Sequence, residues 1–241
     1  MKVSGFTIVR NALKFDYPVV ESINSLLPLV DELIVLVGKS DDDTLGLIQQ
    51  INSPKNKIHH SIWDDNLREG GRVLADETNK SKALVNPESD WIIYLQADEV
   101  LHQKDYPAIR SAMDKWKDDI KVEGLLFNYI HFYGSYDFVG DSRRWYRNEI
   151  RIIRNDKSIY SYRDAQGFRK DDRKLNVKKV DAAVYHYGWV KHPEFQQAKQ
   201  QSFHRMWHDD EWMKKNVADV SAFDYSQIDS LKIFEGIQRC H

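Results

Sequence analysis

Residues 90–99 read DWIIYLQADE. The apolar run in residues 91–95 is too short for a helix that must bury one face, and its composition favours β structure. We therefore expect a buried central strand here. Polar side chains follow at once in Gln96, Asp98 and Glu99, at the carboxyl end of the strand, where open α/β sheets bind their ligands. An ordinary polar loop that closes a strand is the alternative interpretation.

The rest of the first hundred residues alternates between strand and helix patterns. This alternation predicts right-handed βαβ units and a mainly parallel sheet with helices on its faces. The expected fold is an α/β, Rossmann-like three-layer sandwich. The strand patterns cover residues 6–9, 33–37, 58–63 and 91–95, and helix patterns open at Pro18, at Thr44 as the capping residue, and at Val73.

The second half of the chain is less regular, and no linker or repeat divides it from the first. Neither a GxGxxG motif nor a P-loop occurs, so the usual dinucleotide and triphosphate signatures are absent. The patterns predict helices over residues 107–116 and from Pro193 onward, and strands over residues 124–130, 150–154 and 182–187, the last of them ending in His186.

Bulk composition excludes several classes of protein. With 241 residues, 41% hydrophobic and 30% charged, the chain suits one large domain or two closely joined halves. A net charge of −2 argues against a general nucleic-acid binder. No apolar run is long enough for a bilayer, the first residues lack a signal-peptide pattern, and the one cysteine, Cys240, fits a reducing compartment. These features predict a cytoplasmic protein.

Positive charge is concentrated in one segment. Residues 141–179 hold 13 lysines and arginines against 6 aspartates and glutamates, an excess of 13 − 6 = +7. A solvated basic face, a site for a phosphorylated or acidic ligand, and a contact with anionic membrane headgroups are three interpretations that remain open.

Polar motifs follow the predicted strands in a recognisable order. Arg10-Asn11 comes after the first strand, Ser40-x-Asp42-x-Thr44 after the second and Gln96-Ala97-Asp98 after the fourth. In this order they resemble family-two glycosyltransferases of the GT-A fold. The later stretches Arg151-Ile152-Ile153-Arg154-Asn155 and His186-Tyr187-Gly188-Trp189 are similar to that family's small bacterial members.

The resemblance implies one GT-A domain over residues 1–241, with a nucleotide-sugar half (1–116) and an acceptor half (117–241) that ends in a C-terminal helix. It implies a hexosyltransferase-like enzyme of cell-envelope glycan biosynthesis, at the inner face of the membrane. The enzyme would transfer a sugar, with inversion, from a nucleoside-diphosphate sugar to a glycan or lipid-linked acceptor, using Mn²⁺ or Mg²⁺. Two residues depart from the family pattern, since Gly38 replaces the usual acid after the second strand and Gln96 the first acid of the Asp-x-Asp triplet.

Loops after parallel strands open on one edge of the sheet, so several of these polar residues should share a crevice. Asp76 and Asn79, on the polar face of the helix before the fourth strand, could also face it. The candidate nucleotide-sugar-binding residues are Arg10, Asn11, Ser40, Asp42, Asp76, Asn79, Gln96, Ala97 and Asp98.

Oxygen ligands suit Mg²⁺ or Mn²⁺, and a bound cation would stabilise a diphosphate leaving group. Asp98 is the first candidate ligand. His186 is the second, because the resemblance implies a metal-binding histidine near this position. A buried histidine that is hydrogen-bonded within an aromatic cluster is the competing interpretation of His186.

Inverting transfer also needs a base that takes the proton of the acceptor hydroxyl. The resemblance implies a functional acid near Asp164, with Glu149 and Asp141 as rivals; a surface ion pair is the other interpretation of Asp164. Aromatic faces pack on sugar rings and arginine pairs with phosphate, so the candidate acceptor-binding residues are Arg143, Arg144, Trp145 and Tyr146.

A metal-dependent glycosyltransferase is the leading hypothesis. A non-catalytic nucleotide-sugar or glycan-binding domain that retains the fold is the alternative, favoured by Gly38 and Gln96. A nucleotidyltransferase ranks last, because residues 11–14 are a poor substitute for a glycine-rich and basic triphosphate loop.

Overall fold

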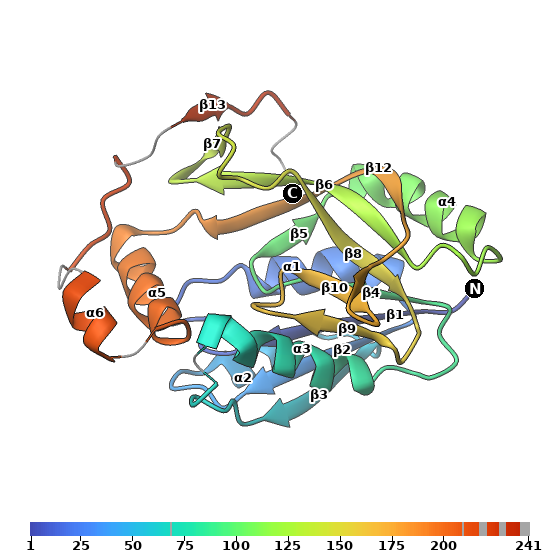
Figure 1. The fold of residues 1–241 in the computed structure, drawn as a ribbon, viewed down its shortest axis with the longest axis horizontal. Helices are drawn as coiled ribbons and strands as arrows, with labels where there is room; N and C mark the ends of the chain where they lie inside the picture. Colours follow the sequence, from blue (N-terminus) through green and yellow to red (C-terminus); the bar gives the residue numbers. More distant parts are fainter. Residues whose placement is uncertain (68, 209, 217–220, 227–229, 237–241) are drawn as a thin grey trace.

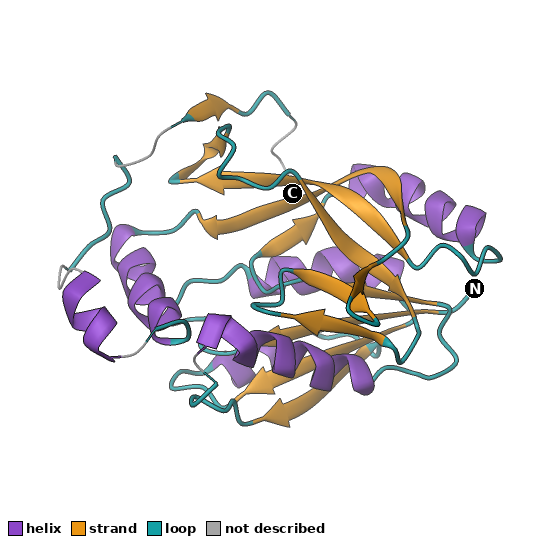
Figure 2. Ribbon diagram, viewed as in Figure 1, coloured by secondary structure: helices purple, strands orange, loops and turns teal. Residues whose placement is uncertain are grey.

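The computed structural model describes residues 1–67, 69–208, 210–216, 221–226 and 230–236. It shows a mixed α/β fold built on one ten-stranded sheet, with a three-stranded sheet beside it. Figure 1 follows the chain through these elements, and Figure 2 shows the strands lying between helices.

Four parallel strands form one side of the large sheet, in the order β4-β1-β2-β3. All residues of β1, β2 and β4 are buried, and this is why their sequences read as nearly continuous apolar runs. The four predicted strands are therefore confirmed. Their bounds are Val3–Val9 (β1), Glu32–Gly38 (β2), Asn56–Ser61 (β3) and Trp91–Tyr94 (β4).

Helices cover both faces of these strands. Ile48 of α2 and Met113 of α4 share a core with Val35 on one face, and α1 packs there too. Val73 of α3 packs with Leu36 on the other face. This layered arrangement confirms the expected α/β fold class. The bounds are Val19–Leu26 (α1), Thr44–Gln49 (α2), Arg72–Ala83 (α3) and Tyr106–Trp116 (α4).

The second half of the chain continues the same sheet. β8 pairs antiparallel with β4 and with β6, so it joins the parallel strands to the later ones. β12 runs parallel to β6 and antiparallel to β5, and β7 and β13 form an edge. The bounds are Glu99–Leu101 (β5), Gly124–Tyr133 (β6), Ser135–Gly140 (β7), Asn148–Arg154 (β8), Val177–Trp189 (β12) and Leu231–Ile233 (β13).

The small sheet lies beside α3, over the central strands. Phe168 contacts Tyr94 edge to face, with 5.8 Å between the ring centres. The sequence interpretation did not include these strands, because they are too short to show a period. They are the antiparallel strands Ile159–Tyr162 (β9), Gly167–Lys170 (β10) and Arg173–Lys174 (β11).

Two expectations about element ends are wrong. Asp43 caps α2 in place of Thr44, because the Asp43 carboxylate accepts the backbone N–H of Gly46 at 3.2 Å. β12 continues beyond His186, because its pairing with β6 extends to Trp189, and β13 follows it. The remaining helices are Pro193–Arg205 (α5), Asp210–Asn216 (α6) and the 3₁₀ turns Leu27–Leu29, Glu69–Gly71 and Gln103–Asp105. Within the described ranges, no helix combines the length and apolar composition needed to cross a bilayer.

Candidate active site

A cavity of about 650 Å³ opens at the carboxyl ends of β1 and β4. Helix α5 forms part of its wall, and in Figure 1 this helix stands at the ends toward which the parallel strands point. This is the edge where open α/β sheets bind ligands. The predicted site residues that line the cavity are Arg10, Asn11, Gln96, Ala97, Asp98, Arg144, Trp145, Tyr146, Asp164 and His186.

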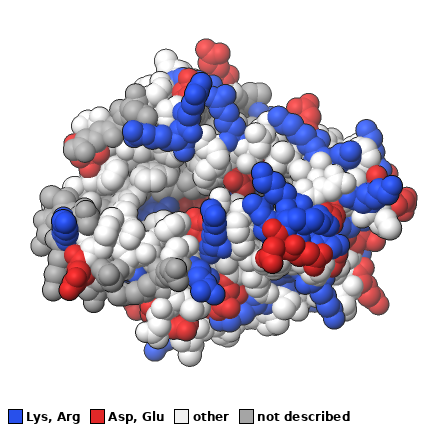
Figure 3. All heavy atoms as spheres, in the orientation of Figure 1, with Lys and Arg blue, Asp and Glu red and all other residues white. Residues whose placement is uncertain are grey.

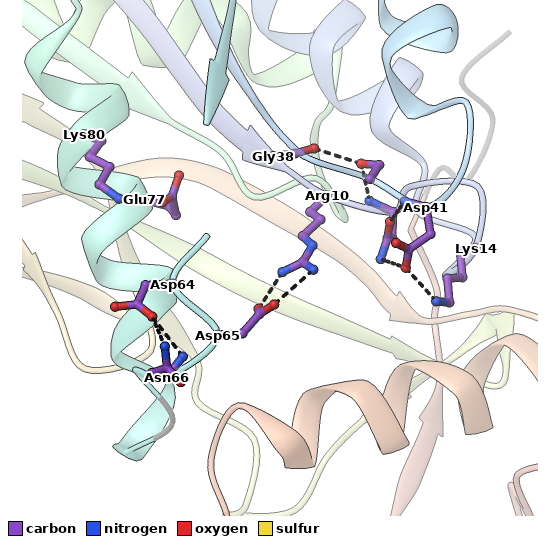
Figure 4. Close-up of polar contacts among 11 residues, drawn as sticks. Arg10, Lys14, Gly38, Asp41, Asp64, Asp65, Asn66, Glu77 and Lys80 are labelled. Carbon is purple, nitrogen blue, oxygen red and sulfur yellow. Dashed lines mark hydrogen bonds and ion pairs between the residues drawn. The ribbon is translucent and has the colours of Figure 1, made fainter. Parts of the chain in front are cut away.

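The loop after β1 lines the cavity, and Figure 4 shows the polar contacts that Arg10 and Lys14 of this loop make. Asn11 has a left-handed backbone (φ 57°), and its side-chain oxygen accepts the N–H of Asp41 at 2.7 Å. The backbone N–H of Asn11 donates to Ser40 Oγ at 3.0 Å. Arg10 forms a two-point pair with Asp65, at 2.7 and 3.4 Å. Arg10 is thereby fixed at the cavity wall, whereas Ser40 supports the loop from outside the lining.

Asp42 acts on the same loop. Its carboxylate accepts the backbone N–H of Lys14 at 2.7 Å and that of Thr44 at 3.0 Å. Neither Ser40 nor Asp42 lines the cavity, and the residue of this segment that does so is Asp41. The two sequence candidates therefore shape the loop that carries Arg10 and Asn11.

Asp76 and Asn79 of α3 also lie outside the cavity lining. Asp76 pairs with Lys80 at 2.7 Å on a partly exposed face of the helix. Asn79 Nδ2 donates to the carbonyl of Ser161 at 2.9 Å, and Asn79 Oδ1 accepts the N–H of Ser161 at 2.7 Å. The structure does not bring them to the crevice that the helix pattern suggested, because Asp76 lies on a partly exposed side of α3 and Asn79 contacts the small sheet.

Asp98 is an acid of the cavity that contacts two nitrogen groups. Its Oδ2 lies 2.9 Å from Lys199 Nζ and 3.5 Å from His186 Nε2. Burial alone would raise the pKa of Asp98, but Lys199 and His186 hold that pKa well below its usual range. Asp98 is therefore an ionised carboxylate in a nearly buried position, with two nitrogen groups on one oxygen.

Asp98 and His186 are separated by a distance that suits a divalent cation between them. Two ligand atoms about 2.1 Å from one ion lie roughly 3 to 4 Å apart, which the 3.5 Å separation satisfies. A Cβ atom at Gly188 would lie 2.5 Å from both Asp98 Oδ2 and His186 Nε2, so the missing side chain leaves room between them. No group of three or more histidine, cysteine or acidic side chains in the described part of the chain is placed to hold a metal. The pair therefore fits a cation whose other ligands are phosphate oxygens and water, as is usual for Mg²⁺.

His186 is also part of a buried histidine pair, whereas the competing interpretation placed it in an aromatic cluster of Tyr185, Tyr187 and Trp189. Its Nδ1 lies 3.2 Å from Nδ1 of His131, whose Nε2 lies 3.2 Å from the carbonyl of Tyr146. Burial and the neighbouring His186 lower the pKa of His131 to about 3. His131 is thus neutral at neutral pH. It contacts Nδ1 of His186, and Nε2 of His186 faces Asp98.

Asp164 lies in the turn between β9 and β10 and lines the cavity. Burial raises its pKa, and its Oδ1 has no hydrogen-bond partner among the described residues. Arg163 and Arg169, the possible partners in the alternative surface ion pair, lie over the ring of Tyr162, 5.8 and 4.2 Å from its centre. Glu149 lies outside the lining and bonds Arg151 Nη1 at 3.4 Å, and burial raises its pKa to about 7. Asp141 pairs with Lys232 at 3.3 Å.

Aromatic side chains form another wall. Trp145 lies edge to face with Trp189, 5.9 Å between ring centres, and both line the cavity with Arg144 and Tyr146. Arg143 does not line it.

Figure 3 shows that the basic side chains on the face seen in Figure 1 gather around a smaller group of acidic ones. Part of the basic segment is paired with acids, since Arg173 lies 2.6 Å from Glu123.

Several lining residues were missed by the sequence analysis: Tyr17, Asp41, Asp65, His131, Trp189 and Lys199. Asp65 follows β3, so the rule that loops after parallel strands share an edge could have found it. Lys199 carried no comparable signal, because it lies 101 residues from Asp98 on a helix of a different region.

No protein-family model matches the sequence, and no curated protein matches it. Among solved structures, S. aureus TarS superposes with a TM-score of 0.51 at 14% identity, over 84% of this chain and 39% of TarS. The structure of TarS 1-349 gives a TM-score of 0.50 at 14% identity, over 84% of this chain and 64% of that one. Glucosyl-3-phosphoglycerate synthase from Mycobacterium tuberculosis, in complex with Mn²⁺, UDP and phosphoglyceric acid, gives 0.36 at 17% identity, over 54% and 43% of the two chains.

This chain therefore spans less than two thirds of the TarS structures that it matches. At such low identity the likeness shows the fold alone. The fold is the mixed α/β fold of the TarS structures, which agrees with the fold class expected from the sequence.

Proposed function

We propose that this protein transfers a sugar from a nucleoside-diphosphate sugar to an acceptor hydroxyl, with inversion. The observation that carries the proposal is the content of one cavity. It joins the Arg10–Asn11 loop, the Asp98–His186 pair, an aromatic wall and the buried carboxyl of Asp164. The loop would contact the donor, and the Asp98–His186 pair would hold a cation on its diphosphate. The aromatic wall would pack on an acceptor sugar, and the carboxyl of Asp164 would be the general base.

In this proposal the first 116 residues bind the donor. Arg10 and Asn11, which line the cavity, would contact the nucleotide, and Gln96 and Ala97, next to Asp98 in the chain, would lie near the diphosphate. Asp98 and His186 would hold Mn²⁺ or Mg²⁺ together with diphosphate oxygens. Such a cation neutralises the charge that develops on the leaving diphosphate.

Asp164 is the proposed base. Its carboxylate accepts the proton of the acceptor hydroxyl, whose oxygen attacks the anomeric carbon as the bond from that carbon to the diphosphate oxygen breaks. A carboxyl with a raised pKa suits this role, because a stronger base takes the proton more readily. The rate should therefore fall at acidic pH, as the Asp164 carboxylate becomes protonated.

Residues 117–241 would bind the acceptor. Trp145 and Tyr146 offer faces for a sugar ring, and Arg144 offers charge for a phosphate. We propose a glycan or lipid-linked acceptor, reached at the inner face of the membrane through the basic segment of residues 141–179.

A non-catalytic nucleotide-sugar or glycan-binding protein is the second candidate. The observation that favours it is the ion pair between Asp98 and Lys199, which occupies the carboxylate that the transferase proposal assigns to a cation. Metal-dependent hydrolysis or transfer of the donor distinguishes the two.

Asp98→Asn and Asp164→Asn test the transferase proposal together. Thermal shifts with a panel of nucleoside diphosphates, with and without Mn²⁺, first identify the nucleotide, because binding to the native state raises the melting temperature. We expect Asp98→Asn to lose the metal-dependent shift. Asp164→Asn should keep that shift and lose turnover by about 100-fold or more.

Asp76→Asn is the matched control, because it changes an acid outside the cavity and should leave shift and turnover unaltered. Full turnover in Asp98→Asn would contradict the proposal. A wild-type protein that shifts with one nucleotide and metal but never turns over would support the binding protein.

A further inference from the structure

The side chain of Lys199 lies in a cradle of three groups. Its Nζ donates to Asp98 Oδ2 at 2.9 Å and to the carbonyl of Gly188 at 3.0 Å, and it lies 5.0 Å from the ring centre of Tyr17. A carboxylate, a carbonyl and an aromatic face are all groups that attract a cation. Only 14% of the side chain is exposed. The Lys199 ammonium group therefore supplies the positive charge beside Asp98.

Lys191 lies against the same Tyr17 ring, 4.7 Å from its centre, but it is held differently. Its Nζ donates to the carbonyls of Phe15 and Asp16, at 2.5 and 3.1 Å. Lys191 is buried and does not line the cavity, whereas Lys199 does. Of these two ammonium groups, Lys199 is the one that can meet a ligand in the cavity.

Lys199 and a divalent cation would compete for one oxygen. The Oδ2 atom that accepts from Lys199 is also the atom that faces His186 Nε2 at 3.5 Å. Two positive groups on the same carboxylate oxygen repel each other strongly at such short range. A cation that takes the position between Asp98 and His186 therefore releases Lys199.

We infer that Lys199 exchanges partners: it rests on Asp98 in the ligand-free protein and moves to the diphosphate of the ligand when a divalent cation takes Asp98. This inference rests on the proposed function, because it assumes a diphosphate in the cavity. A lysine side chain suits the exchange, because its flexible four-carbon stem lets the charge move while α5 stays in place. Before the exchange, Lys199 neutralises the charge of Asp98. After it, the cation neutralises Asp98 and the diphosphate neutralises Lys199, so that neither residue carries an unpaired charge.

Lys199→Met tests the exchange with two binding measurements that need no sugar donor. Electron paramagnetic resonance measures Mn²⁺ binding without pyrophosphate, and calorimetry measures pyrophosphate binding to the protein saturated with Mn²⁺. Mn²⁺ affinity should rise about tenfold, because the competing ammonium is gone. Pyrophosphate affinity should fall about tenfold or more, because a charged hydrogen-bond donor is lost.

The controls separate this from a structural role. Lys14→Met removes another lysine of the cavity lining, one that pairs with Asp41 at 3.0 Å, and should change neither affinity by more than about twofold. Lys199→Arg keeps the charge and should keep pyrophosphate binding. If Lys199 only anchored α5, Lys199→Met would weaken Mn²⁺ and pyrophosphate binding alike, and this result overturns the inference.

An unchanged Mn²⁺ affinity in Lys199→Met, or a wild-type protein that binds neither probe, overturns it as well. Failure of the proposed function looks different. In that case the two affinities change in opposite directions as expected, but no nucleoside-diphosphate sugar is consumed.

Discussion

At the level of single residues, the lack of a side chain at Gly188 leaves space between Asp98 and His186. Gly188 follows His186 by two positions near the end of β12, and Asp98 lies directly before β5. Any Cβ at position 188 would enter the space between Asp98 Oδ2 and His186 Nε2. The space proposed for a cation thus depends on the absence of a side chain as much as on the two ligands.

Gly188→Ala should therefore lower the affinity for Mn²⁺ about tenfold or more, although both ligands remain, because the new methyl group pushes them aside. Electron paramagnetic resonance of Mn²⁺ measures this directly. Gly167→Ala is the matched control, since its Cβ would meet Glu149 and Tyr162 only at 3.7 and 3.9 Å, an ordinary contact distance. Undiminished Mn²⁺ binding in Gly188→Ala would show that the cation does not lie there.

At the scale of elements, the contact between α3 and β9 explains why two polar residues on a helix are not site residues. Asn79 binds both backbone groups of Ser161, which is buried at the start of the turn that carries Asp164. The helix therefore holds the small sheet in place, and it positions the proposed base without touching a ligand.

Asn79→Ala should destabilise the protein by about 2–3 kcal/mol, because it leaves the buried N–H and C=O of Ser161 unpaired. Urea unfolding measures the change, and metal-dependent nucleotide binding by the protein that remains folded should be unaltered. Asp76→Ala, one turn earlier on the same helix, should cost less than about 1 kcal/mol, because it removes only an exposed ion pair. A loss of nucleotide affinity in Asn79→Ala without a loss of stability would restore Asn79 as a binding residue.

At the scale of the whole molecule, a buried ion pair ties the edge of the cavity to the later strands. Arg151 of β8 donates to both carboxylate oxygens of Glu99, at 2.7 and 2.5 Å, and both side chains are almost fully buried. Glu99 also accepts the N–H of Gln96 at 3.0 Å and the hydroxyl of Tyr129. One carboxylate thus fixes the loop of Asp98, strand β8 and strand β6 relative to one another.

Arg151→Met should lower the free energy of unfolding by about 3–5 kcal/mol, because Glu99 would be left as a buried charge without its partner. Thermal or urea unfolding measures the loss. Arg169→Met, which removes an arginine stacked on Tyr162 in the small sheet, should cost about 1 kcal/mol or less. Equal losses in the two variants would show that the Glu99 pair has no special part in joining the sheet.

The amino-acid sequence was sufficient to predict β1, β2 and β4, because strands that are buried on both faces are mostly apolar. It also predicted that Arg10, Asn11 and Asp98 lie at one edge of the sheet, where all three line the cavity. The short strands β9, β10 and β11 could not be predicted, since a few residues do not show a period.

Which polar side chains face the cavity depends on how the elements pack against one another. The helix pattern shows only that Asp76 and Asn79 lie on the polar side of α3. In the folded protein Asp76 pairs with Lys80 of the same helix, and Asn79 contacts Ser161 of the small sheet. In the same way, Lys199 reaches Asp98 only because α5 packs across the strand ends. Such contacts join residues far apart in the sequence, and no local pattern encodes the angle at which two packed elements meet.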